Sequence, residues 1–188
     1  MRRIMRDALI PGAVAVGMAF VIQASVAKPY EIPTGSMIPT IQEHDRIIAN
    51  RLVYRFRDIE RGDIVVFTPP AAAIRACDPP KGVPFVKRVI GVAGDRVEVR
   101  GGKTFVNGRE FVVKNARVPQ YEMDFSVVPK GKLLLLGDNR NNSCDSHQWG
   151  QGADGPDTDQ DAAFAPIGNV IGQAEVVYWP ISRVRFLD

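Results

Sequence analysis

The sequence predicts a mostly β protein, built as an antiparallel β-sheet or barrel assembly behind one N-terminal transmembrane helix. Three observations lead to this fold class. Residues 8–27 form one long apolar run, the rest of the chain carries short apolar runs between turn signals, and the 14 prolines and 17 glycines are scattered rather than clustered. No segment after residue 27 shows the period of an amphipathic helix.

The apolar run at residues 8–27 has the length of a membrane-spanning helix. It holds 20 residues and no charged side chain, which at about 1.5 Å rise per residue is roughly the 30 Å of a bilayer core. One acidic residue, Asp7, precedes it, together with three arginines: Arg2, Arg3 and Arg6. The positive-inside rule therefore predicts that residues 1–7 are cytoplasmic and that residues 28–188 form an extracytoplasmic domain.

A cleavable secretory signal is the alternative interpretation of this run. The small residues Ser25, Val26 and Ala27 stand where a signal-peptide cleavage site needs them. Because the apolar run is longer than the usual signal core, we expect a retained anchor. Either interpretation exports the remainder of the chain, which is long enough for one core and a small subdomain.

The exported part carries patterns typical of strands. Short apolar runs bounded by turn residues are consistent with buried strands, and they lie at residues 46–50, 63–67, 85–90, 133–136 and 174–179. Residues 95–100 end in an alternation of polar and apolar side chains. The pairs Gly101-Gly102 and Asn107-Gly108 are typical two-residue hairpin turns. Together they predict a three-strand meander that extends to about Val113.

Charge and cysteine content limit the function classes. The net charge is +3 and there is no clustered basic patch, so a nucleic-acid partner is unsupported. Cys77 and Cys144 could form a disulfide in an exported domain, but the sequence does not give their separation, and we expect two free thiols. Three aspartates within residues 157–161 resemble the start of a calcium loop, yet Ala162 stands where glycine is needed. We expect an acidic surface loop and no metal or other cofactor.

One turn presents a serine hydroxyl in a rigid setting. Residues 33–40 read PTGSMIPT, so that a proline stands near either end and restricts the backbone. Gly35 removes a side chain where another backbone could approach. Ser36 follows it, and Thr34 supplies a second hydroxyl two residues earlier. A polar surface turn is the simple interpretation of this segment, because a serine is a poor nucleophile without a base.

Lys87 is the candidate base. The chain has only two histidines, and His44 lies in a polar turn, so the usual imidazole base has few candidates. A lysine can replace it if its amine is neutral near the working pH. The neighbours within residues 83–90 are mostly apolar, and Arg88 adds a positive charge. We therefore expect a pKa lowered from about 10.4 to roughly 8; a lysine on the exposed face of a strand is the alternative.

A polar loop follows the buried run at residues 133–136. Residues 137–147 read GDNRNNSCDSH and offer hydroxyls and carboxylates that could hold a neutral lysine amine in one orientation. Taken alone, this composition is typical of a surface loop rich in turn formers.

These segments resemble, in order, the sequence boxes of bacterial type I signal peptidases, a family of serine–lysine peptidases. The matching stretches are PTGSMIPT at 33–40, RGDIVVF at 61–67, KRVIG at 87–91 with Gly94-Asp95, and GDNRNNS at 137–143 with Asp145-Ser146. Four ordered motifs are far more specific than an isolated Gly-Ser-Met. The resemblance extends from the apolar run to about Val177.

The resemblance implies the roles of the reacting groups. Ser36 would be the nucleophile and Lys87 the general base that activates it. The oxyanion hole would consist of the backbone N–H of Ser36 and the hydroxyl of Thr34.

Supporting roles follow in the same way. Ser143 stands where a serine orients the lysine amine in this family. Asp145 stands where a carboxylate supports the loop through an arginine, for which Arg88 is one candidate. His147 occupies a position where the family often has an arginine, so this carboxylate pairing is expected to be weaker or pH-dependent.

The resemblance also implies a fold and a substrate pocket. The family has an antiparallel β catalytic core with a small inserted β subdomain, whose counterpart here is residues 98–130. Shallow pockets that admit only small side chains at the −1 and −3 substrate positions would be lined by Ile32, Val86 and Phe85.

The function implied by the resemblance is that of a membrane-anchored serine endopeptidase. It would remove signal peptides from exported preproteins at Ala-x-Ala sites, as a monomer in contact with lipid, on the outer (periplasmic) side of the inner membrane. A specialised relative that matures one substrate, such as a conjugative pilin, and a non-catalytic exported β-domain are the alternatives. The joint occurrence of Ser36, Lys87 and the Ser143/Asp145 loop in family order favours the peptidase.

Overall fold

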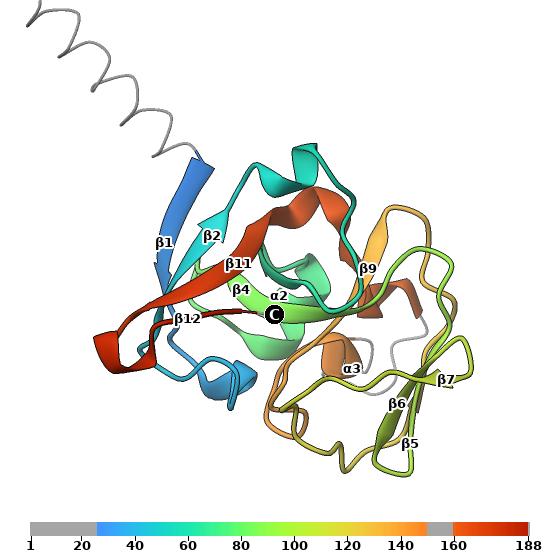
Figure 1. Ribbon diagram of the computed structural model, residues 1–188. Helices are drawn as coiled ribbons and strands as arrows, with labels where there is room; N and C mark the ends of the chain where they lie inside the picture. Colours follow the sequence, from blue (N-terminus) through green and yellow to red (C-terminus); the bar gives the residue numbers. More distant parts are fainter. Residues whose placement is uncertain (1–25, 150–159, 188) are drawn as a thin grey trace, which may run out of the picture.

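The computed structural model describes residues 26–149 and 160–187, which fold into two antiparallel sheets (Figure 1). The larger sheet has eight strands in the order β1-β2-β11-β3-β4-β9-β10, and β12 pairs with β11. These strands are β1 (Ala27–Glu31), β2 (Arg46–Asn50), β3 (Ile64–Phe67), β4 (Phe85–Gly91), β9 (Lys132–Leu136), β10 (Ala165–Pro166), β11 (Val170–Trp179) and β12 (Arg185–Phe186). The expected mostly β, antiparallel fold is confirmed.

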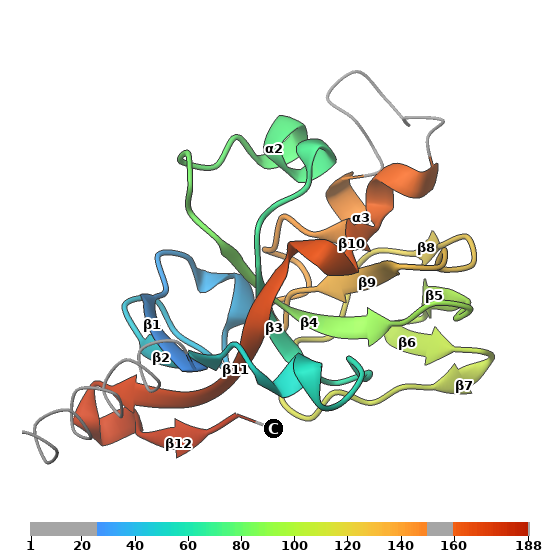
Figure 2. The ribbon, with the colours of Figure 1, turned by 90° about the horizontal axis from the view of Figure 1, so that it is seen from above.

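A smaller sheet of four strands lies beside β4 and β9, on the other side of the molecule from β1, β2 and β12 (Figure 2). Its order is β7-β6-β5-β8, and its strands are β5 (Val97–Arg100), β6 (Lys103–Val106), β7 (Arg109–Glu110) and β8 (Met123–Asp124). Asn107 and Gly108 adopt positive φ angles of 53° and 76°, as a tight hairpin turn requires. The third strand of the expected meander is shorter than predicted, because β7 ends at Glu110 rather than near Val113.

The central strands are buried on both faces. Ile64 and Val66 of β3 pack in one apolar cluster, whereas Val65 and Phe67 pack in another on the opposite face. The leucines of β9 divide in the same way, and alternate ones reach the core beneath the smaller sheet. Strands covered on both sides read as continuous apolar runs, which is why the sequence marks them clearly.

Strand β4 lies between β3 and β9 and carries Lys87 in its interior. Lys87 is opposite Val65 of β3, and the next residue, Arg88, is opposite Leu136 of β9. With paired strands on both sides and apolar clusters above and below, a polar side chain in this strand loses its contact with bulk water. The fold therefore places Lys87 in a desolvated position.

Two short helices occur after residue 27, where the sequence shows no helical period. They are α2 (Ala71–Cys77) and α3 (Ser146–Trp149). Helix α2 begins after Pro70 with three alanines and ends at Cys77; the next residue, Asp78, is left-handed with φ 42°. Both helices are too short for a hydrophobic period to be visible in the sequence. Short 3-10 turns are η1 (Gly35–Met37), η2 (Val53–Arg55), η3 (Gln160–Ala163), η4 (Ile167–Asn169) and η5 (Ile181–Arg183).

The predicted membrane segment at residues 8–27 lies almost entirely outside the described residues, as do Asp157 and Asp159 of the acidic loop. Within the ranges 26–149 and 160–187, no helix has the length and hydropathy needed to cross a bilayer. Strand β1 begins at Ala27, so the chain enters the larger sheet where the apolar run ends.

Cys77 and Cys144 form a disulfide, which corrects the expectation of two free thiols. Their Cα atoms are 6.0 Å apart, within the usual range for a disulfide. The bond joins the last residue of α2 to the loop before α3, two segments separated by 67 residues in sequence. The packing of α2 against α3 brings the cysteines together, and that contact has no signature in the sequence.

We expect the double variant Cys77→Ala/Cys144→Ala to unfold with a free energy lower by up to roughly 4 kcal/mol, because a cross-link over a loop of this length restricts the unfolded chain by about that amount. Urea unfolding at equilibrium measures the change. As a control, a reductant should lower the midpoint of the native protein and leave that of the double variant unchanged. Equal midpoints for the native protein and the double variant in the absence of reductant would contradict the expectation.

Candidate active site

The turn that carries Ser36 is fixed by buried side chains on either side of it. Ile32 and Met37 are 3% and 0% exposed and belong to the same apolar cluster. Between them the chain is extended at Thr34 (φ −134°, ψ 151°) and then enters the 3-10 turn η1. The turn therefore has two apolar anchors in the core and leaves Ser36 half-buried at the surface.

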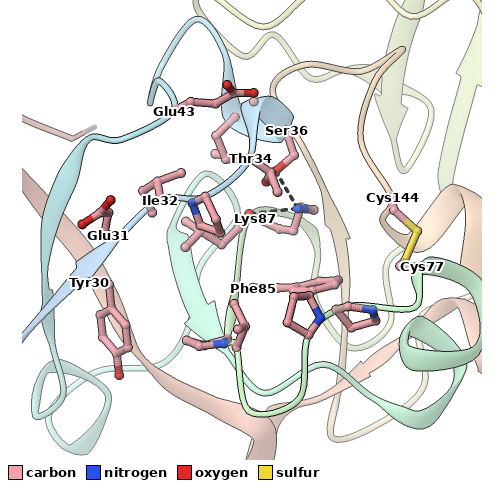
Figure 3. A pocket seen from close by; sticks show the side chains of 18 of the residues that line it. Tyr30, Glu31, Ile32, Thr34, Ser36, Glu43, Cys77, Phe85, Lys87 and Cys144 are labelled. Atoms are coloured by element: carbon pink, nitrogen blue, oxygen red, sulfur yellow. Dashed lines mark hydrogen bonds between the residues drawn. A yellow bond between two sulfur atoms is a disulfide. The ribbon is translucent and has the colours of Figure 1, made fainter.

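The side chain of Lys87, on β4, lies within hydrogen-bond distance of the side chain of Ser36, in the turn η1 (Figure 3). The Lys87 Nζ atom is 2.8 Å from Ser36 Oγ and also donates to the carbonyl oxygen of Val86 at 3.2 Å. The Thr34 hydroxyl donates to Ser36 Oγ at 3.4 Å. The structure thus brings together three groups, from two chain segments 51 residues apart, that the sequence analysis assigned to one site.

Burial sets the protonation of this lysine. Lys87 is only 4% exposed, and the loss of solvent lowers the pKa of its amine to about 8, while the negative charge of Asp145 acts in the opposite direction. A substantial fraction of the amine is therefore neutral at mildly alkaline pH. A neutral amine within hydrogen-bond distance of a hydroxyl can accept its proton.

Arg88 does not have the role that the sequence suggested. Its guanidinium forms a two-pronged ion pair with Asp138, with Nε–Oδ1 and Nη2–Oδ2 distances of 2.9 and 2.8 Å, and both residues are buried. The candidate partnership with Asp145 is thus replaced by one with Asp138. Because Asp138 compensates the charge of Arg88, burial rather than this neighbouring cation accounts for the lowered pKa of Lys87.

The polar loop at residues 137–147 packs directly against the serine turn. Asn139 donates its backbone N–H to the carbonyl oxygen of Ser36 (3.1 Å) and its side-chain amide to that of Gly35 (2.9 Å). A Cβ on Gly137 would collide with the carbonyl oxygen of Ser36 and with the Ser143 hydroxyl, so only glycine allows this approach. Asn139 was not among the residues predicted for the site, and its position within the GDNRNNS stretch is the signal in the sequence that points to it.

Ser143 and Asp145 are both brought to the site, with contacts other than those expected. The Ser143 hydroxyl is buried and has no hydrogen-bond partner among the described residues, so the expected bond to Lys87 is not formed. Asp145 is 0% exposed, and its carboxylate accepts from the backbone N–H of Gly137 (2.8 Å) and from His147 Nδ1 (2.7 Å). His147 therefore supplies the donor for which an arginine was expected.

A pocket of about 640 Å³ opens in front of Ser36 and Lys87. The three residues expected to line it, Ile32, Phe85 and Val86, are all in its wall. Their apolar side chains form the part of the wall close to Ser36. The Cys77–Cys144 disulfide forms part of the opposite wall (Figure 3), a contribution that the sequence did not indicate.

Comparison with known proteins places the chain in one family. The model of the family "Signal peptidase, peptidase S26" matches residues 5–179. Signal peptidase I of Leptolyngbya laminosa is 37% identical over 181 residues, which cover 94% of this chain and 82% of the relative. Probable signal peptidase I-2 of Synechocystis sp. is 42% identical over 175 residues, covering 92% of this chain and 72% of the relative. Thylakoidal processing peptidase 1 of Arabidopsis thaliana is 38% identical over 178 residues, covering 90% of this chain and 47% of the relative.

These identities extend over most of the chain, and the family match includes the serine turn, strand β4 and the polar loop. The resemblance drawn from the four sequence motifs is therefore confirmed. The chain belongs to the signal peptidase family, peptidase S26, and is a serine peptidase of the signal peptidase I type.

Proposed function

We propose that this protein cleaves signal peptides from exported preproteins after small residues, with Ser36 as nucleophile and Lys87 as general base. The observation that carries the proposal is the 2.8 Å contact between Ser36 Oγ and a lysine amine that is 4% exposed. A serine without a catalytic role does not require a buried lysine amine beside it. A nucleophilic serine does require a base that is neutral at the working pH.

The geometry supports a two-step acyl transfer. The neutral Lys87 amine takes the proton of Ser36 as Oγ attacks the scissile carbonyl carbon. The resulting ammonium then protonates the leaving amine, and an ester forms on Ser36. Lys87 next takes a proton from the water molecule that attacks the ester carbonyl carbon. As the bond from that carbon to Oγ breaks, the lysine ammonium returns the proton to Ser36 Oγ, and the new C-terminal acid leaves as a carboxylate. We assign the backbone N–H of Ser36 and the hydroxyl of Thr34 to the oxyanion of the substrate, because the N–H belongs to the attacking residue and the Thr34 hydroxyl lies 3.4 Å from Ser36 Oγ.

The pocket accounts for the proposed preference for small side chains. Ile32 and Val86 are 3% and 7% exposed and are packed in the same apolar cluster, so the wall beside Ser36 cannot move aside without opening the core. Such a wall admits Ala, Gly or Ser at the −1 position. A large residue there would hold the carbonyl carbon away from Ser36.

Membrane anchoring is part of the same proposal. The apolar run at residues 8–27 would span the bilayer with residues 1–7 in the cytoplasm, and residues 28–188 would form the peptidase domain on the outer face, with residues 98–130 as an inserted subdomain. Ser36 lies nine residues after Ala27, which keeps the site near the membrane surface. A signal peptide that leaves the bilayer then needs to unwind only a few residues to reach it.

The dyad is tested by substitution. We expect Ser36→Ala, Lys87→Met and Lys87→Arg each to lower kcat by about 10³-fold or more, because a nucleophile and its base act as a unit and a guanidinium does not lose its proton. Cleavage of a purified precursor by detergent-solubilised protein measures the loss. Ser182→Ala and Lys81→Met, which alter exposed residues, should behave as the native enzyme. Substantial activity in any of the three dyad variants would disprove the assignment.

The lowered pKa of Lys87 predicts a pH dependence. The base must be neutral, so kcat/KM should be constant well above pH 8 and should fall about tenfold per pH unit below the pKa of about 8. Initial rates between pH 6 and 10 give the profile, and circular dichroism at each pH excludes unfolding as the cause. Full activity at pH 6 would show that the base is another group.

A precursor series tests the substrate class. Cleavage at an Ala-x-Ala site should be blocked when the −1 residue is replaced by Phe, because the pocket wall excludes the ring. A panel of unrelated precursors with small −1 residues distinguishes general processing from an enzyme dedicated to one substrate. Equal cleavage of the Ala and Phe members would leave a serine peptidase and remove the signal-peptide specificity.

A further inference from the structure

Glu43 is a carboxylate at the edge of the pocket that the proposed mechanism does not use. It lies in the loop between η1 and β2, it is exposed, and it is one of the residues that line the pocket. Figure 3 shows it on the same side of Lys87 as Thr34 and Ser36. A substrate segment bound in front of Ser36 therefore passes close to this charge.

The Glu43 carboxylate is packed against the turn that carries the nucleophile. A Cβ built on Gly35 would stand 2.9 Å from Glu43 Oε1, which is closer than an ordinary contact. Gly35 is not among the glycines with a positive φ angle, so the turn needs glycine here for space and not for conformation. The carboxylate thus lies against the residue between Thr34 and Ser36, the two residues assigned to the oxyanion hole.

The charge of Glu43 is not compensated. Among residues 26–149 and 160–187, its side chain has no ion pair or hydrogen bond, whereas Glu31 at the same edge lies with Oε2 3.6 Å from Arg46 Nε. The pocket lining includes one more acidic residue, Asp78, which adjoins the disulfide, and one basic residue, Lys87. An uncompensated carboxylate acts on the charges of whatever occupies the pocket, and most strongly on the nearest ones.

The place of Glu43 determines which substrate side chains it can reach. In the proposed complex, the −1 and −3 side chains enter the apolar wall formed by Ile32 and Val86. Successive side chains of an extended chain point to opposite faces, so the −2 and +1 side chains point away from that wall and toward the exposed edge of the pocket. They also flank the bond that Ser36 attacks. A charge at −2 or +1 is therefore the one that meets Glu43.

We propose that Glu43 is a specificity-determining residue, which favours precursors with a basic side chain at −2 or +1 and disfavours those with an acidic one. The inference rests on the proposed cleavage by Ser36, and it adds a charge preference to the size preference of the pocket. Because the carboxylate meets the same substrate charge in the bound complex and in the transition state, the preference should appear in KM and not in kcat.

Precursors that differ in one side chain test this preference. Each has an Ala-x-Ala site with Lys, Gln or Glu at −2, or with the same three residues at +1. An exposed ion pair changes an equilibrium by about 1.5- to fivefold, and attraction and repulsion combine when Lys is compared with Glu. At one or both positions, the native enzyme should therefore cleave the Lys precursor with a kcat/KM about 3- to 20-fold above that of the Glu precursor.

Substitution of Glu43 should remove or invert this ratio. We expect Glu43→Gln to bring the Lys-to-Glu ratio of kcat/KM to within about twofold of one, and Glu43→Lys to invert it. Asp78→Asn should keep most of the native ratio, because Asp78 adjoins the disulfide and not the serine turn. Glu122 is exposed and does not line the pocket, so Glu122→Gln and Glu122→Lys are the matched controls. About 0.5 M NaCl should bring the native ratio toward one, because salt screens exposed charges.

A binding measurement gives a readout that does not need cleavage. In a Ser36→Ala background, fluorescence anisotropy measures the Kd of labelled peptides that carry Lys or Glu at −2 or +1. The Lys peptide should bind more tightly than the Glu peptide by the same factor as in KM, and the difference should disappear in Ser36→Ala/Glu43→Gln.

The outcomes distinguish the two proposals. Failure of the native enzyme to cleave any precursor would overturn the proposed function, while the Kd ratio would still report on Glu43. If the Gln precursors are cleaved but the Lys-to-Glu ratio is near one at both positions, or stays high in Glu43→Gln, the inference is wrong and the proposed function stands. An equal loss of activity toward all three precursors in Glu43→Gln would show a structural role for Glu43 and would also contradict the inference.

Discussion

The structure depends on one requirement, that a lysine amine be kept out of water beside a serine hydroxyl. An amine of ordinary basicity would be charged at neutral pH and could accept no proton. The interior of β4, with β3 and β9 on either side, supplies the desolvation that lowers the pKa of Lys87. Ser36 then has to be brought to that strand from a turn 51 residues earlier, and the anchors Ile32 and Met37 do this.

The charges around the site are arranged so that desolvation dominates. Arg88 follows Lys87 on the same strand, but it pairs with Asp138 and its charge is compensated. Asp145 is buried and negative, and alone it would favour the ammonium form. Its carboxylate accepts hydrogen bonds from two backbone N–H groups and from His147. The pKa of Lys87 thus reflects a larger lowering by desolvation and a smaller raising by the charge of Asp145.

The polar loop is the element on which the separate parts of the chain converge. Asn139 binds the serine turn, Cys144 is joined to α2, and the charge of Asp145 raises the pKa of Lys87. Residues 117–121, between β7 and β8, also bind the loop, through hydrogen bonds from Arg117 to Asp138 and from Gln120 to Asn141. A loop restrained in this way keeps Gly137 in close contact with the serine turn, which holds Ser36 beside Lys87.

The main strands, the family and the proximity of Ser36 to Lys87 were predictable from the sequence, because apolar runs of strand length and four ordered motifs are local signals that do not depend on tertiary contacts. The sequence did not determine which partner each polar side chain has. Arg88 binds Asp138 instead of Asp145, Cys77 and Cys144 are bonded, and Ser143 has no bond to the amine. Such pairings depend on distances between segments far apart in the chain, and only the packing of the strands and helices sets those distances.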